Sequence, residues 1–123
     1  MNSKSILVVE DDPWIREALA QVLEIEGYSV LTAHDGEEGL EILKRDGVAQ
    51  PSLVFLDLMM PVMDGWEFLA MKKKDPSLAK IPVVVLSASG QRVAPPGASA
   101  YFEKPFEIDR ILEIAKDCLG ACA

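Results

Sequence analysis

The sequence predicts an α/β protein built on a doubly wound, five-stranded parallel sheet. Short apolar runs alternate with amphipathic stretches along the whole chain, which is typical of strands joined by helices. Three runs, at 6–9, 53–56 and 83–86, are apolar throughout, as strands covered on both faces must be. Because 123 residues can enclose one core but not two, we expect a single domain over residues 1–123.

Two strand–helix units fill the first half of the chain. After the strand at 6–9, a helix is expected at 13–26, since Asp12 can cap it and Pro13 suits its first turn. The second unit has a more mixed strand, which suits a place near the sheet edge, and a shorter helix. We expect them at 28–33 and 36–45.

The second half adds three strands and two clear helices. The strands are expected at 53–56, 83–86 and 100–103, and the helices at 65–74 and 107–119. Between Ser87 and Tyr101, Pro95-Pro96 and two glycines cannot sustain several helical turns, so the fourth of five helices is expected to be shortened or missing. Right-handed crossovers then give a flavodoxin-like sheet of order 2-1-3-4-5.

Composition excludes several classes of protein. Half the residues are hydrophobic, which favours a compact domain over a disordered one, and the net charge of −8 disfavours direct contact with nucleic acid. We interpret Lys72-Lys73-Lys74 as a solvated last helical turn. No segment is typical of a signal peptide or a membrane span, and Cys118 and Cys122 are expected to be reduced thiols. These features predict a cytoplasmic protein.

Polar residues follow the apolar runs. Glu10-Asp11-Asp12 follow the first strand, Asp57 the third, Ser87 the fourth and Lys104-Pro105 the fifth. Because the carboxyl ends of parallel strands meet at one edge, these groups should converge near the first and third strands. Packed carboxylates repel one another unless a cation neutralises them, and Mg²⁺ is the hard divalent ion that suits such ligands. Asp12 is expected to be a cap and not a ligand.

The same residues suit phosphoryl transfer. A carboxylate can become an aspartyl phosphate while a metal ion and a lysine neutralise charge and a hydroxyl donates a hydrogen bond. Asp57, Lys104 and Ser87 fit these three roles. Each residue alone is more often a cap or a loop former; their joint occurrence in strand order is what indicates a site.

These residues resemble the receiver domains of response regulators in two-component signalling, chemotaxis regulators included, over essentially the entire chain. Residues 57–65 are similar to the family's phosphoacceptor motif D-x-x-M-P-x-x-D-G. Residues 6–16, 85–88 and 101–106 resemble its opening strand with acidic turn, its hydroxyl segment and its Lys-Pro segment.

The resemblance implies that Asp57 is phosphorylated. It also implies that Asp11 and Asp57 bind Mg²⁺ directly together with the main-chain carbonyl of Met59, while Glu10 acts through water. Such a domain catalyses only its own phosphorylation and dephosphorylation.

Ser87 and Tyr101 would form the switch, through which phosphorylation biases an existing two-state equilibrium. The implied partners are a sensor histidine kinase or histidine phosphotransfer protein and a downstream protein target, with neither nucleic acid nor membrane. We expect a monomer or weak dimer. In the family the fourth helix belongs to the dimerisation and output face, so its erosion here means that the resemblance assigns no partner to that face.

Two other functions compete. A metal-dependent phosphatase that uses an aspartyl phosphate would need a second acid two residues after the nucleophile, where Met59 stands, and a cap domain. An interaction module could keep the fold without the chemistry, which the intact acid, hydroxyl and lysine set argues against. We expect no output domain after the last helix, and the sequence does not separate a stand-alone protein from part of a longer one.

Three further residues, one histidine and two tryptophans, are expected to have structural roles. His34, the sole histidine, is expected to serve a cap or turn and not phosphotransfer. Trp14 and Trp66 flank the two acidic loops and are expected to be packed in the core or partly exposed.

Overall fold

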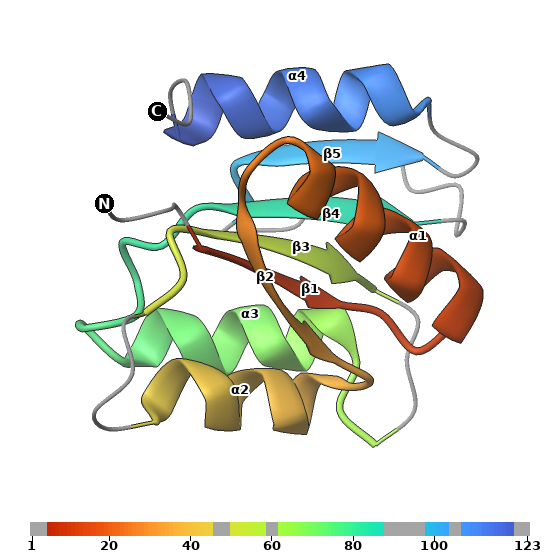
Figure 1. Cartoon of the computed structure of the whole chain (residues 1–123). Helices are drawn as coiled ribbons and strands as arrows, with labels where there is room; N and C mark the ends of the chain where they lie inside the picture. Colours follow the sequence, from red (N-terminus) through yellow and green to blue (C-terminus); the bar gives the residue numbers. More distant parts are fainter. Residues whose placement is uncertain (1–4, 46–49, 59–61, 88–97, 104–106, 120–123) are drawn as a thin grey trace.

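The protein forms one parallel five-stranded sheet with helices on both faces (Figure 1). The computed structural model describes residues 5–45, 50–58, 62–87, 98–103 and 107–119. The strands are β1 (Ser5–Val9), β2 (Ser29–Ala33), β3 (Leu53–Asp57), β4 (Val83–Ser87) and β5 (Ala100–Glu103), in the spatial order β2-β1-β3-β4-β5. The predicted flavodoxin-like sheet is therefore confirmed.

Four helices lie within the described residues. They are α1 (Pro13–Ile25), α2 (Gly36–Lys44), α3 (Gly65–Lys74) and α4 (Ile108–Leu119). Every helix and strand begins and ends within one residue of its predicted bounds. Most of the segment between β4 and β5 lies outside the described residues, and its described part, 98–99, is not helical, consistent with a fourth helix that is shortened or missing.

Each face of the sheet has its own apolar core. Helices α2 and α3 cover one face, and α1 and α4 cover the other (Figure 1). The strands in the middle, β1 and β3, are buried along almost their whole length, as their continuous apolar sequences predict. The buried sheet consequently holds in place the residues that follow the carboxyl ends of its strands.

Aspartates fix the first turn of three helices. The carboxylate of Asp12 accepts from the amides of Trp14 at 2.9 Å and Ile15 at 3.4 Å, which confirms its predicted role as the cap of α1. Asp35 caps α2 and Asp64 caps α3 in the same way. All three helices begin directly after a strand or its loop, so these caps also fix the loops at the carboxyl edge.

Two sequence-based expectations about surface residues are wrong. Lys72 is only 4% exposed and its Nζ donates to the carbonyl of Ala79 at 3.3 Å, so only Lys73 and Lys74 belong to a solvated turn. Burial lowers the pKa of Lys72. Trp14 is 83% exposed and is not packed in the core, whereas Trp66 is partly exposed as expected. Among the described helices none is long and apolar enough to cross a membrane.

Candidate functional site

Three carboxylates meet at the carboxyl edge of the sheet. Glu10 and Asp11 follow β1, and Asp57 is the last residue of the adjacent strand β3. One carboxylate oxygen from each of the three lies within 4.8 Å of the others. Glu10 is 2% exposed and Asp57 4% exposed, while Asp11 is open to solvent. A solvent-accessible acid thus lies at the mouth of a pair of buried ones.

Main-chain hydrogen bonds hold the turn between β1 and α1. The amide of Glu10 donates to the carbonyl of Ala33 at 3.0 Å, which continues the pairing of β1 with β2 by one residue. The amide of Asp12 donates to a carboxylate oxygen of Glu10 at 3.2 Å. Since Asp12 is itself fixed as a helix cap, this bond orients the Glu10 carboxylate.

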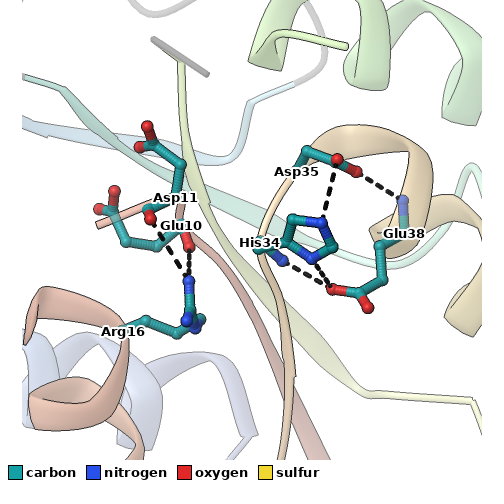
Figure 2. A network of polar contacts seen from close by, with 6 residues as sticks. All are labelled: Glu10, Asp11, Arg16, His34, Asp35 and Glu38. Carbon is teal, nitrogen blue, oxygen red and sulfur yellow. Dashed lines mark hydrogen bonds and ion pairs between the residues drawn. The ribbon is translucent and has the colours of Figure 1, made fainter. Parts of the chain in front are cut away.

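Arg16 contacts the same turn from the first part of α1. Its Nη1 donates to the carbonyl oxygen of Glu10 at 2.8 Å and lies 3.4 Å from that of Asp11 (Figure 2). Both acceptors are main-chain carbonyls and not carboxylates. Arg16 was not among the site residues expected from the sequence. The available signal was an arginine four residues after a capping aspartate, where its side chain can fold back over the turn.

Glycine at position 65 allows the turn after β3 to close. The amide of Gly65 donates to the carbonyl of Leu58 at 3.0 Å. A Cβ at Gly65 would lie 2.7 Å from the Cα of Leu58 and 2.8 Å from the carbonyl oxygen of Asp57. Within this loop Val62 has a φ of 67°, a left-handed conformation that is strained for a β-branched residue. The described residues of this loop are therefore tightly constrained beside Asp57.

The other predicted site residues lie on the neighbouring strands or outside the described residues. Ser87 ends β4, one residue beyond the partner of Asp57 in the sheet register. Tyr101 lies in β5 opposite Val85, its ring packs on the core beneath α2 and α3, and its buried hydroxyl has no hydrogen-bond partner among the described residues. Lys104 and Met59 lie outside the described residues, so their expected roles stay predictions.

His34 takes part in a small ionic cluster beside the site (Figure 2). Its ring Nδ1 lies 2.6 Å from a carboxylate oxygen of Glu38, and its Nε2 lies 3.4 Å from that of Asp35. Its amide donates to the same Glu38 oxygen at 2.7 Å, which agrees with the expected turn role. The hydrogen bond to Glu38, reinforced by the charges of Glu38 and Asp35, raises the pKa of His34.

The donor set of the acidic cluster fits a hard divalent cation. Oxygen ligands from carboxylates are what Mg²⁺ prefers, and it needs only one or two of them together with water. The 4.8 Å spread of Glu10, Asp11 and Asp57 allows a single ion to lie close to all three. Within the described part of the chain, the cluster consists of carboxylates alone.

Comparison with known sequences identifies the family. The model of the response regulator receiver domain family matches residues 6–116. The chain is 41% identical over 108 residues to the probable transcriptional regulator ycf27 of Porphyridium aerugineum, covering 86% of this chain and 44% of that protein. It is 37% identical over 112 residues to the DNA-binding dual master transcriptional regulator RpaA of Synechocystis, covering 87% of this chain and 45% of that protein. The chain thus spans about half the length of these relatives.

Solved structures agree with this result. A putative response regulator from Chloroflexus aurantiacus superposes with a TM-score of 0.85 at 28% identity, covering 96% of this chain and 98% of that one. The response regulator TrrA of Thermotoga maritima, solved in complex with Mg²⁺ and BeF, superposes with a TM-score of 0.79 at 34% identity, covering 94% and 99%. The chain therefore belongs to the response regulator receiver domain family, the phosphoacceptor domains of two-component systems.

Proposed function

We propose that Asp57 is the phosphoacceptor of this receiver domain and that Mg²⁺ is its cofactor. The observation that carries the proposal is the approach of Glu10, Asp11 and Asp57 to within 4.8 Å at the carboxyl edge of β1 and β3. A Mg²⁺–BeF complex of the related TrrA supports it by analogy. Asp11 and Asp57 would bind the ion directly with the carbonyl of Met59, and Glu10 would act through water.

The reaction transfers a phosphoryl group from a phosphohistidine. A carboxylate oxygen of Asp57 forms the new O–P bond while the P–N bond of the donor breaks and the imidazole leaves. When bound, Mg²⁺ supplies positive charge beside the transferred oxygens. The ammonium of Lys104 would neutralise a further oxygen, and the hydroxyl of Ser87 would donate to another. The domain would catalyse only this transfer and the later hydrolysis of its own aspartyl phosphate, in which water takes the phosphoryl group as inorganic phosphate and the Asp57 carboxylate is restored.

The signal would leave through Ser87 and Tyr101. Movement of the Ser87 hydroxyl toward the phosphoryl group would free space behind it for the ring of Tyr101. The buried hydroxyl of Tyr101, which has no partner among the described residues, is consistent with a ring that has a second position available. Phosphorylation would then change the surface around β5.

The proposed partners are proteins. The donor is a sensor histidine kinase or a histidine phosphotransfer protein, and the output is contact with a downstream protein target. We propose that this domain does not itself contact DNA, because its net charge of −8 repels phosphate. It would act in the cytoplasm as a monomer or weak dimer.

Phosphorylation by a small donor tests the proposal. The protein is incubated with Mg²⁺ and acetyl phosphate and examined by intact mass; the beryllofluoride complex is followed by tryptophan fluorescence. A single phosphoryl adduct is expected for the wild type and for Asp64→Asn, which keeps the cap of α3, but not for Asp57→Asn. An adduct that survives Asp57→Asn, or none on the wild type, would refute the assignment.

A further inference from the structure

We propose that Arg16 is a positioning residue for the metal ligands. By binding the main-chain carbonyls of Glu10 and Asp11, it would hold the turn after β1 in the conformation that brings their carboxylates to Asp57. This inference rests on the Mg²⁺ site proposed above and extends it to a residue outside the ligand set.

The contacts of Arg16 are directed at the backbone of the turn. Its Nη1 donates to the carbonyl of Glu10 at 2.8 Å and approaches that of Asp11 at 3.4 Å (Figure 2). Hydrogen bonds from a charged donor are shorter and stronger than neutral ones. One guanidinium nitrogen therefore restrains two consecutive peptide groups, and these are the peptide groups of the two acids on this turn that would serve the metal.

Arg16 is itself well anchored. Its amide donates to the carbonyl of Asp12 at 2.9 Å at the start of α1, and Asp12 caps that helix. Further along α1, Leu19 and Leu23 are fully buried against the sheet. The side chain thus connects the acidic turn to a packed helix, so that the turn does not have to be ordered by the metal alone.

A rigid turn should increase the affinity for the ion. Glu10 and Asp11 carry like charges and, with Asp57, repel one another before a cation arrives. If the turn were free, the acids could move apart in the absence of metal and would have to be reassembled on binding. Groups that orient metal ligands through hydrogen bonds typically change metal affinity about 10–100-fold when removed.

The direction in which the Kd for Mg²⁺ changes when Arg16 is removed distinguishes a positioning role from a purely electrostatic one. A guanidinium near a cation site repels the cation, so an Arg16 that acted only through its charge would weaken Mg²⁺ binding, and its removal would tighten it. Removal of a positioning residue would instead weaken Mg²⁺ binding. Screening by about 0.5 M salt suppresses the charge effect far more than the effect of geometry.

Titration with Mg²⁺ of the whole chain, followed by tryptophan fluorescence, tests the inference. Trp14 lies next to the acidic turn and is 83% exposed, so it is available as a reporter. Arg16→Ala should raise the Kd for Mg²⁺ about 10-fold or more at both low and high salt. Arg16→Lys keeps a charged donor without the planar guanidinium, so its Kd for Mg²⁺ should lie between those of the wild type and Arg16→Ala. Arg45→Ala, an exposed arginine after α2, is the matched control and should stay within twofold of the wild type.

Unfolding in urea without metal accompanies each titration. A role confined to stability would lower the unfolding midpoint of Arg16→Ala but leave the Kd of the folded protein unchanged, and that result, or tighter binding, would overturn the inference. If Arg16→Ala does not fold, Arg16→Lys is the deciding variant. Its Kd for Mg²⁺ is expected to be at least about threefold higher than that of the wild type, and an unchanged Kd would contradict the inference. A wild type that binds no Mg²⁺ would instead remove the metal proposal, and this inference with it.

Discussion

The carboxylates of Glu10 and Asp57 lie within 4.8 Å of one another although Glu10 is 2% and Asp57 4% exposed. Two acids so close and so poorly solvated oppose folding whenever both are charged. The buried strands β1 and β3 lead to these acids, and Arg16 binds the turn that carries Glu10, so the two carboxylates are held close together. The fold therefore holds like charges close together, and a divalent cation can relieve their repulsion.

Replacement of Asp57 by asparagine should leave the stability unchanged or raise it by roughly 1 kcal/mol in metal-free buffer, since one of the repelling charges is removed at constant shape. The measurement is urea unfolding in the presence of a chelator. Asp109→Asn, an exposed acid in the first turn of α4, is the control and should change stability by no more than about 0.5 kcal/mol. A clear loss of the free energy of unfolding in Asp57→Asn would contradict this account of the cluster.

Substitution of Gly65 by alanine should destabilise the protein by about 1–3 kcal/mol, because its Cβ would meet backbone atoms of Leu58 and Asp57 at 2.7–2.8 Å. Gly39→Ala, also in a helix, meets side-chain atoms of Val9 and Phe68 at the longer distances of 3.0–3.1 Å. Its cost should be smaller because alanine also favours the helix. Chemical denaturation ranks the two variants, and an equal or larger loss in Gly39→Ala would contradict the proposed contact.

The sheet could be predicted from the sequence because each of its elements is specified by residues that are close together in the chain. Continuous apolar strands, helix caps and the prolines and glycines between elements fix both the type and the order of the elements. The convergence of the acids could be anticipated for the same reason: parallel strands deliver their carboxyl ends to one edge, so Asp11 and Asp57 needed no side-chain detail to be placed together.

Contacts between side chains and distant backbone were harder to predict. The burial of Lys72 follows from its place four residues after Phe68, on the buried stripe of α3, but its charge favoured the opposite interpretation. Trp14 shares its face of α1 with the exposed residues Ala18 and Ile25, a periodicity that its large apolar ring obscured. The hydrogen bonds of Arg16 depend on the path of the turn, which no sequence pattern specifies.

The roles of the two adjacent acids, Asp11 and Asp12, should separate in a metal titration. Asp12→Asn keeps a side-chain oxygen that can accept from the amides of Trp14 and Ile15, so it should change the Kd for Mg²⁺ little. Asp11→Asn removes a proposed ligand charge and should weaken binding at least about 10-fold. Asp12→Ala should lower the free energy of unfolding by about 1 kcal/mol through loss of the cap. A larger loss of affinity in Asp12→Asn than in Asp11→Asn would reverse the assignment.

The ion pair between His34 and Glu38 should make stability depend on pH near neutrality. The hydrogen bond to Glu38, with the charges of Glu38 and Asp35, raises the pKa of His34, although desolvation and the charge of Arg16 act in the opposite direction. Because the pKa of His34 is raised in the folded state, its contribution to the free energy of unfolding is complete below the ordinary histidine pKa of about 6.5. This contribution is lost as pH rises through the raised pKa. Hydrogen bonds from the amide of His34, and then from its side chain, lower the pKa of Glu38. The contribution of Glu38 to stability is therefore lost as pH falls through its lowered pKa.

The pair therefore stabilises the fold most between these two transitions, around pH 5–6. Because the chain has one histidine, a single ring signal in NMR reports its titration directly. The pKa of His34 should lie above its ordinary value in the wild type and move down toward it in Glu38→Gln, which keeps an acceptor for the His34 amide but removes the charge. The urea midpoint of the wild type should exceed that of Glu38→Gln by more at about pH 5.5 than at about pH 9. A His34 titration that is the same in both proteins would show that the pair does not form in solution.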